Sequence, residues 1–330
     1  MIAKAIAPAL LLCLALTACQ PPTEPNQSPA TTQEAATPKA LGPWMGMKPT
    51  AEPVVLAPEL LASSLDEYNG TFSPDGRTFV YTTNTPAKGF ICWTQMDDNG
   101  VWHEPTVTSF SGVYSEYDPL FSPDGSQLFF SSERPINDTA KYGTTRAWMV
   151  ALTDTGWTEP QVVPLTGEGD YYSSTARNGS MYFNVWKHGD IYRGTPNDTG
   201  YAVEALPEAI NGGQSVGDPF VSPEEDYLIF RGYDNSLGSG DLYISYQVAG
   251  EWSEPQNLGE PINSNKHEMC PWVTRDGRFF VWASSRNSGY VNGPNNPVAA
   301  LREQHRSHDN GQLNIHYISA DFIENLRPKP

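Results

Sequence analysis

Apolar residues in this chain are grouped in short runs that are separated by tight-turn sequences. The pattern is clearest from Tyr117 to Phe130 (YDPLFSPDGSQLFF), where an extended run ends in Ser-Pro-Asp-Gly and bulky apolar residues follow. Proline presets φ, aspartate bonds its own backbone and glycine accepts positive φ, so this tetrapeptide predicts a turn between two strands. Apolar residues at successive positions, as in Leu128-Phe129-Phe130, predict strands that are covered on both faces.

This unit occurs five times along the chain. The copies align on one turn position, with steps of 49, 54, 46 and 52 residues, and the aligned residues are Gly76, Gly125, Gly179, Glu225 and Gly277. A second hairpin turn follows four of the copies, and three of these turns lead into the related phrases GVWHEP, GWTEP and GEWSEP. Repeats of about 40–50 residues with four strands each are typical of propeller blades.

The repeated turn resembles that of a known family. FSPDG at Phe72–Gly76 and at Phe121–Gly125 is similar to the mark of the TolB-like, WD40-like β-propeller repeats, in which it follows the innermost strand. The resemblance runs from about Glu52 to the C-terminus and is weakest at Ala176–Gly179. It implies an all-β, five-bladed β-propeller of four-stranded antiparallel blades over residues 51–330. We expect no helix in this region.

The ends of the repeat region predict how the ring closes. Glu52-Pro53-Val54-Val55-Leu56 resembles the outer-strand phrase Glu159–Val163, yet it precedes the first inner strand. The last copy ends near residues 314–319 without an outer strand of its own. We therefore expect Val54–Leu56 to supply the outer strand of the last blade.

The N-terminus predicts an exported, lipid-anchored protein. Residues 1–18 have one lysine followed by an apolar run too short for a stable membrane span, which is typical of a signal peptide. Leu16-Thr17-Ala18-Cys19 resembles the lipobox of bacterial lipoproteins, which implies lipidation of Cys19. Gln20 follows instead of aspartate, which implies an outer-membrane lipoprotein that faces the periplasm or the cell surface. Residues 19–50, rich in Pro, Thr, Ala, Gln and Glu, predict a disordered tether.

Charge and cysteine content narrow the possible partners. Twenty basic residues against 38 acidic ones give a net charge of -18, which argues against nucleic acid as a partner. The same charge opposes adsorption to an anionic membrane surface, so we expect membrane contact through the lipid anchor alone. Cys92 and Cys270 remain in the propeller, and their apolar strand contexts favour buried free thiols over a disulfide.

Candidate site residues lie near the start of the inner strands, where propeller loops surround the axial channel. Nine residues before the turn position, four of the five copies have an acid, namely Glu67, Glu116, Asp170 and Glu268. Two residues later, the second and fourth copies have Asp118 and Asp218. Such acids suit a hard cation or a polyhydroxylated ligand, and they equally suit hydrogen bonds to loop backbone, the interpretation that we favour.

Basic residues are predicted on the same face. Arg134 and Arg286 lie nine residues after the turn, and Arg231 comes from the fourth copy. These arginines predict either an ion-paired rim or recognition of a carboxylated or sulfated saccharide. The long insertion after Arg286 contains a basic cluster, which predicts either a lid over an anionic ligand or a surface flap, and it consists of Arg302, His305, Arg306 and His308.

Two classes of function remain open. The favoured hypothesis is a propeller that binds an envelope protein or a small-molecule or saccharide ligand on its channel face, without cofactor and without catalysis of its own. The alternative is a glycoside hydrolase or polysaccharide lyase that uses Glu67, Glu116, Asp170 and Glu268 as channel acids. A calcium ion in the channel is a third possibility.

Overall fold

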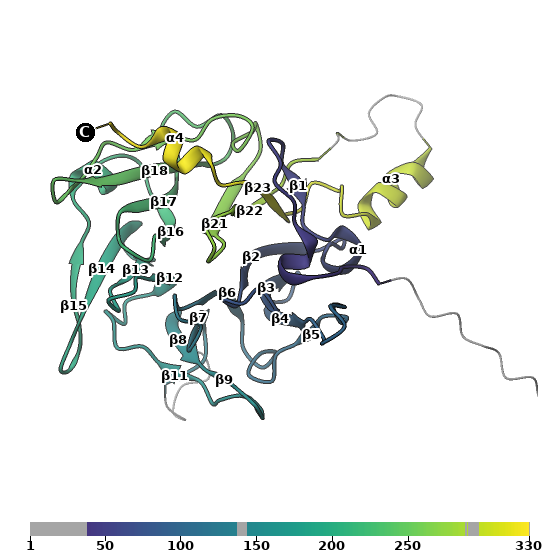
Figure 1. The fold of residues 1–330 in the computed structure, drawn as a ribbon, viewed down its shortest axis with the longest axis horizontal. Helices are drawn as coiled ribbons and strands as arrows, with labels where there is room; N and C mark the ends of the chain where they lie inside the picture. The colour runs from purple at the N-terminus through teal and green to yellow at the C-terminus, as the bar shows by residue number, and fades with distance from the viewer. Residues whose placement is uncertain (1–37, 137–143, 288, 290–296, 330) are drawn as a thin grey trace, which may run out of the picture. The chain divides into compact units, whose positions relative to one another are not determined.

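The computed structural model describes residues 38–136, 144–287, 289 and 297–329. The predicted signal peptide, the lipidation site at Cys19 and most of the tether lie outside the described residues. Five antiparallel sheets are arranged around one axis as a five-bladed β-propeller (Figure 1). The fold class predicted from the repeats is therefore confirmed.

The first two strands of each blade flank the repeated turn. The inner strands are β2 (Asp66–Phe72), β6 (Glu116–Phe121), β12 (Asp170–Thr175), β16 (Gly217–Val221) and β21 (Glu268–Val273). The second strands are β3 (Thr78–Asn84), β7 (Leu128–Ser132), β13 (Met181–Val185), β17 (Tyr227–Gly232) and β22 (Phe279–Ser284). Every residue of β7, β13 and β22 is buried, as expected for strands with a neighbouring blade on each face.

The third and outer strands complete the blades. The third strands are β4 (Gly89–Gln95), β8 (Arg146–Val150), β14 (Asp190–Asn197), β18 (Asp241–Val248) and β23 (Asn314–Ser319). The outer strands of the first three blades are β5 (Thr106–Val107), β11 (Gln161–Val162) and β15 (Gly200–Ala205), and a hairpin of β9 (Leu152–Thr153) and β10 (Gly156–Trp157) extends the second blade. In the fourth blade β18 pairs with both β19 (Glu251–Trp252) and β20 (Gln256–Asn257).

The ring closes through the N-terminal strand, as predicted. β1 (Val54–Val55) pairs antiparallel with β23, placing Val54 opposite Tyr317 and Val55 opposite His316. The Leu56 N–H continues this pairing by donating to the Ile315 carbonyl at 2.8 Å. The last blade is thus built from both ends of the propeller region, and it becomes complete only when those ends meet.

The segment before β1 corrects the predicted boundary of the tether, because its last residues are folded. Trp44 and Met45 are buried in the short 3₁₀ turn η1 (Pro43–Gly46), and the Trp44 ring contacts Phe72 edge-on at 5.3 Å. Trp102 donates its indole N–H to the Gly42 carbonyl at 2.7 Å. Residues 40–47 therefore pack onto the first blade, because the aromatic and methionine side chains find apolar surface there.

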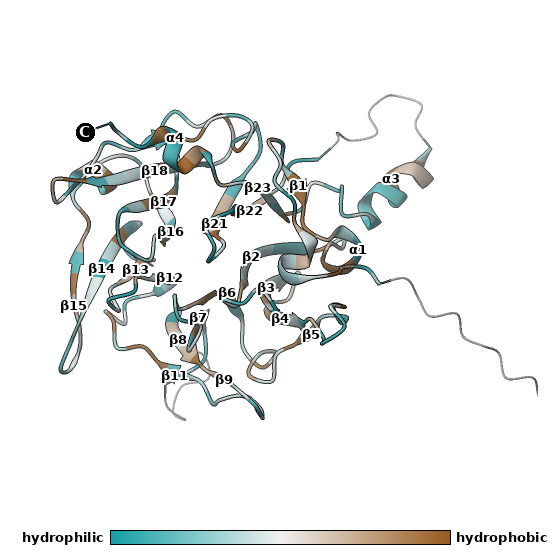
Figure 2. Cartoon of the chain, in the orientation of Figure 1, coloured by the Kyte–Doolittle hydropathy of each residue, from teal (hydrophilic) through white to brown (hydrophobic). Residues whose placement is uncertain are grey.

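The propeller region contains helices, although none was expected there. Three are single turns, α1 (Pro58–Leu61), α2 (Glu208–Asn211) and α4 (Phe322–Leu326). The insertion after Arg286 contains the longer α3 (Val298–Arg306), where no helix was expected. Its Ala, Leu, Arg, Glu and Gln residues are good helix formers, and Figure 2 shows its N-terminal part in hydrophobic colours and its C-terminal part in hydrophilic ones. No helix in the described ranges has the length and apolar character needed to cross a membrane.

Candidate functional site

The four acids at the starts of the inner strands are bound to the loops that precede them. Glu67 accepts hydrogen bonds from the Ser63 N–H at 3.0 Å and the Ser63 hydroxyl at 2.6 Å. Glu268 accepts the same pair from Ser264 at 3.0 and 2.6 Å. Glu116 accepts from the Gly112 N–H at 3.1 Å, and Asp170 from the Gly167 N–H at 2.7 Å. The side chains of all four are nearly inaccessible, so each has a structural role, while ligand binding by them stays a prediction.

Two of the predicted arginines belong to the same loops. Arg134 Nη2 lies 3.1 Å from Glu116 Oε1 and donates to the Phe110 carbonyl at 2.6 Å. Arg286 Nη2 lies 3.4 Å from Glu268 Oε1, and its Nη1 donates to the Pro261 carbonyl at 2.9 Å. Each arginine therefore ties the end of a second strand to the loop that enters the same blade. This is the geometry of the ion-paired rim.

A β-bulge interrupts every inner strand within three residues of its start. The register shifts there in all five blades, and the residue at the bulge has a positive φ between 47° and 58°. These residues are Asn69, Asp118, Tyr172, Asp218 and Cys270. Asn and Asp tolerate this left-handed conformation, but Tyr and Cys rarely adopt it, so the repeat imposes it on them. Bulges often re-aim side chains beside binding sites.

Hydrogen bonds between blades fix the bulges. The Tyr172 N–H donates to Ser131 Oγ of the preceding blade at 3.0 Å, and Ser131 in turn donates to Asp118 at 3.2 Å. The Asp118 N–H donates to Thr82 Oγ1 at 3.1 Å, and the Asp218 N–H donates to Asn184 Oδ1 at 2.8 Å. These contacts hold the side chains at the centre of the ring in a defined arrangement.

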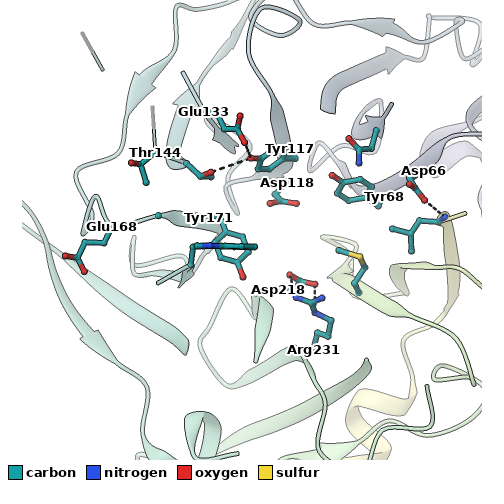
Figure 3. Close-up of a pocket in the computed structure, with 16 residues that line it drawn as sticks. Asp66, Tyr68, Tyr117, Asp118, Glu133, Thr144, Glu168, Tyr171, Asp218 and Arg231 are labelled. Atoms are coloured by element: carbon teal, nitrogen blue, oxygen red, sulfur yellow. Dashed lines mark hydrogen bonds and ion pairs between the residues drawn. The ribbon is translucent and has the colours of Figure 1, made fainter. Parts of the chain in front are cut away.

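A cavity of about 580 Å³ opens at this centre, on the face where the inner strands begin. All five blades contribute to its lining, and Asp118, Asp218 and Arg231 are the predicted site residues that it includes. Figure 3 shows Asp118 and Asp218 facing one hollow, with Arg231 reaching Asp218. The structure thus separates two groups among the candidate residues: three at the cavity and the others in the loops.

Aromatic side chains form much of the cavity wall. Tyr68, Tyr117 and Tyr171 occupy equivalent positions in three successive blades, directly after the loop-bound acid. Trp186 lies beyond them, 79% exposed, with its ring 6.0 Å from that of Tyr171 in an edge-on arrangement. Sequence reasoning missed these residues, although the phrases DEY, SEY and GDY mark the three tyrosines in register.

The two aspartates of the cavity differ in their electrostatic environment. Arg231 Nε lies 3.1 Å from Asp218 Oδ2, and the two side chains are 15% and 3% exposed. Asp118 instead receives neutral hydrogen bonds, from Asn69 Nδ2 at 3.3 Å and from Ser131. Burial, with a smaller contribution from the negative charge of Asp218, raises the pKa of Asp118 to about 7. Near neutral pH the cavity therefore contains one carboxyl group that is only partly ionised.

Possible metal ligands, the cysteines and the basic cluster are the remaining candidate features. Within the described ranges, no three His, Cys, Asp or Glu side chains gather closely enough to hold a metal ion. Cys92 and Cys270 are both buried and free, on different blades. The basic cluster lies on and just after the exposed helix α3, and its action as a lid stays a prediction.

Comparison with known proteins gives similarity in fold only. No family model and no curated protein matches this sequence. Similar solved structures include TolB from Acinetobacter baumannii, with 16% identity and a TM-score of 0.43 over 61% of this chain and 45% of that one. A putative TolB from Agrobacterium tumefaciens has 15% identity and a TM-score of 0.45 over 70% of this chain and 73% of that one.

A thermostable family-43 glycoside hydrolase has 12% identity and a TM-score of 0.49, over 77% of this chain and 89% of that one. The region aligned with the Acinetobacter protein spans less than half of that protein's length. These similarities carry no inference about ligand or activity.

Proposed function

We propose that this chain is a TolB-like, lipid-anchored propeller of the bacterial cell envelope that binds a small organic ligand in the axial cavity. The observation that carries the proposal is the cavity itself, at about 580 Å³. Ligand sites of roughly 300–1,000 Å³ are usually concave, largely apolar and equipped with a few fixed polar groups. Here tyrosine and tryptophan side chains form the wall, and Asp118, Asp218 and Arg231 supply the polar groups.

A small ligand suits this face better than an envelope protein as the main partner. The polar groups lie at the bottom of a hollow, where they are within reach of a molecule that enters it. The loop acids Glu116 and Glu268 are buried and already bonded within their own loops, so they offer no free carboxylate to a protein partner. Binding of an envelope protein around the rim stays compatible with this proposal.

Filling the cavity tests the proposal. Thr144 lines the cavity and is exposed, so Thr144→Trp introduces a large side chain with little effect on the core. Thr155→Trp, in the exposed turn between β9 and β10, is the matched control. We expect a panel of defined sugars, amino acids, nucleosides and amines to include a compound that raises the melting temperature of the native chain and of Thr155→Trp but not of Thr144→Trp. Equal shifts in all three proteins would contradict the proposal.

The anchor is tested separately. The sequence Leu16–Cys19 supports lipidation of Cys19, and the test is incorporation of labelled palmitate in a bacterial host, with Cys19→Ala as control. We expect label in the membrane fraction only for the native chain. Equal labelling of Cys19→Ala, or a native chain without label, would contradict the anchor.

Glycoside hydrolysis is the second candidate function, and the aspartate pair favours it. Acid catalysis at a glycosidic oxygen needs a carboxyl group that is protonated near neutral pH beside a second, charged one. Asp118, with a pKa of about 7, would be the protonated group of such a pair, and Asp218, which pairs with Arg231, would be the charged one. The test is release of reducing ends from plant and algal polysaccharides. We expect activity that Asp118→Asn abolishes if the hydrolase proposal holds, and no release by the native chain if it fails.

A further inference from the structure

The lining of the axial cavity carries an excess of negative charge. Among the described lining residues there are five carboxyl groups and one guanidinium, and that guanidinium belongs to Arg231, which already pairs with Asp218. Glu168 lies at the outer edge and pairs with Lys187 at 3.1 Å. Asp66, Asp118 and Glu133 remain, and none of them forms an ion pair within the described part of the chain, although Asp118, with a pKa of about 7, is partly protonated near neutral pH. Their bonds come from neutral donors, such as the Tyr117 hydroxyl at 2.9 Å from Glu133.

The aromatic wall complements this charge. The faces of tyrosine and tryptophan rings carry negative electrostatic potential and attract cations, by about 0.5–2 kcal/mol for each contact. Tyr68, Tyr117 and Tyr171 approach the cavity from three blades, and Trp186 extends the wall outward. A tryptophan that is 79% exposed is unusual in a folded domain, and a bound ligand would cover it.

A buried hydrogen-bond acceptor without a partner also indicates a ligand that donates hydrogen bonds. Asn69 is 2% exposed and donates to Asp118, but its Oδ1 has no hydrogen-bond partner among the described residues. An acceptor in this position needs a donor, because an unmade hydrogen bond in a buried site is unfavourable. This unpartnered acceptor lies directly behind Asp118, which lines the cavity, so a ligand that donates hydrogen bonds suits this part of the ring.

From these observations we infer that the ligand of the axial cavity is an organic cation whose ammonium group lies between the tyrosine wall and the carboxylates. The inference rests on the proposed function and specifies the ligand's chemical class. Anionic saccharides fit poorly, because their carboxylate or sulfate groups would face several acids across a small hollow. A neutral sugar satisfies the hydrogen-bond acceptors but gains nothing from the excess charge, so charge is the property to test.

The experiment compares ligands of equal shape and different charge by calorimetry on the full chain. Choline and its neutral isostere 3,3-dimethylbutan-1-ol form the central pair, with putrescine and spermidine as further cations. Glucose and xylose represent neutral sugars, and glucuronate represents anionic ones. We expect the cations to bind, with choline at least about tenfold tighter than its isostere, in line with several cation–π contacts.

Variants connect the binding to the cavity. Tyr171→Ala removes one aromatic ring of the cavity wall, and Glu133→Gln removes one negative charge. Each variant should weaken choline binding about fivefold or more. Asp154→Asn, which removes an exposed acid in the β9–β10 turn, should change it by less than about twofold. Circular dichroism establishes that each variant is folded before it is titrated.

The outcomes separate this inference from the proposed function. Equal binding of choline and its isostere, or binding of neutral sugars alone, overturns the cation inference and leaves a ligand-binding cavity. Binding of glucuronate in preference to the cations also overturns it. If no compound binds, both the inference and the proposed function fail. Binding of cations that is unchanged in Tyr171→Ala and Glu133→Gln shows attachment elsewhere and overturns the assignment to this cavity.

Discussion

Arg231 and Asp218 form a largely buried ion pair beside the propeller axis, with Nε 3.1 Å from Oδ2. Asp218 also accepts a hydrogen bond from the Cys270 N–H of the next blade at 3.3 Å. One carboxylate therefore joins a second strand of its own blade to the bulge of the neighbouring blade. The pair has a structural role in the ring as well as a place in the cavity.

Removal of one partner of this pair should destabilise the protein strongly. Arg231→Gln leaves Asp218 without its cation, and breaking a buried pair in this way typically costs about 3–5 kcal/mol. In the double variant Asp218→Asn/Arg231→Gln the uncompensated charge is absent, so we expect part of this loss to be recovered. Urea unfolding of both variants measures the difference. A double variant no more stable than Arg231→Gln would contradict this explanation.

Protonation of two buried acids should give the protein a characteristic pH dependence. Burial raises the pKa of Glu67 and of Asp118 to about 7, the second with a contribution from Asp218. Between about pH 4 and pH 7 the unfolded chain releases these protons while the folded chain retains them. The unfolded state then binds fewer protons, so the contribution of these two groups to stability falls as the pH rises through this range.

The variant Asp118→Asn tests this expectation. Its amide cannot ionise, and it can keep the hydrogen bond from Ser131 while donating to the free Asn69 Oδ1. Relative to the native chain, we expect Asp118→Asn to gain stability between pH 5 and pH 8, as measured by urea unfolding at both values. The exposed control Asp154→Asn should show no such gain. A parallel shift of both variants would argue against a raised pKa at Asp118.

The loop-bound acids should matter for stability in proportion to their burial. Glu268 Oε1 accepts hydrogen bonds from Ser264 and Ser284, and Glu268→Gln places an amide where several donors converge. We expect a loss of about 3 kcal/mol or more for this variant. Glu224→Gln breaks an ion pair with Arg177 whose side chains are 64% and 58% exposed, and should cost at most about 1 kcal/mol.

The same comparison tests the role of Glu268 in ligand binding. At a temperature where Glu268→Gln is folded, we expect its affinity for a ligand of the cavity to match that of the native chain. A stable variant with much weaker binding would place Glu268 in the ligand site instead.

Ring closure through β1 gives a further prediction. Leu56 is 1% exposed and continues the pairing of β1 with β23, whereas Val54 on the same strand is 40% exposed. Leu56→Ala should cost about 2–5 kcal/mol, because it leaves a cavity in the seam between the two ends of the propeller. Val54→Ala should cost less than about 1 kcal/mol. Similar losses in thermal or urea unfolding for both variants would mean that the seam contributes little.

The architecture was predictable from the sequence because it repeats. Each Ser-Pro-Asp-Gly turn fixes where an inner strand ends, and five copies at steps of 46–54 residues fix the number of blades. The phrase around Val54 resembles the other outer strands, so ring closure was predictable as well. Helix α3 was missed because a single nine-residue helix in a long insertion has no counterpart in the other copies.

The site was predictable only in part, because the sequence does not show whether a repeated acid binds a ligand or holds a loop in place. By register, Glu67, Glu116, Asp170 and Glu268 are equivalent, and the sequence identifies them as acids at the channel face. Only the tertiary structure shows that their oxygens are taken up by N–H and hydroxyl groups of the preceding loops. The bulge depends on the neighbouring blade as well, because the Tyr172 and Asp218 N–H groups donate hydrogen bonds to side chains of the preceding blades.

The sequence by itself thus determined the fold and the face on which to search, since local turn chemistry and apolar runs act within each repeat. The tertiary structure decided which acids face the cavity and gathered Tyr171, Trp186 and Arg231 around them, because those contacts join blades that are far apart in the chain.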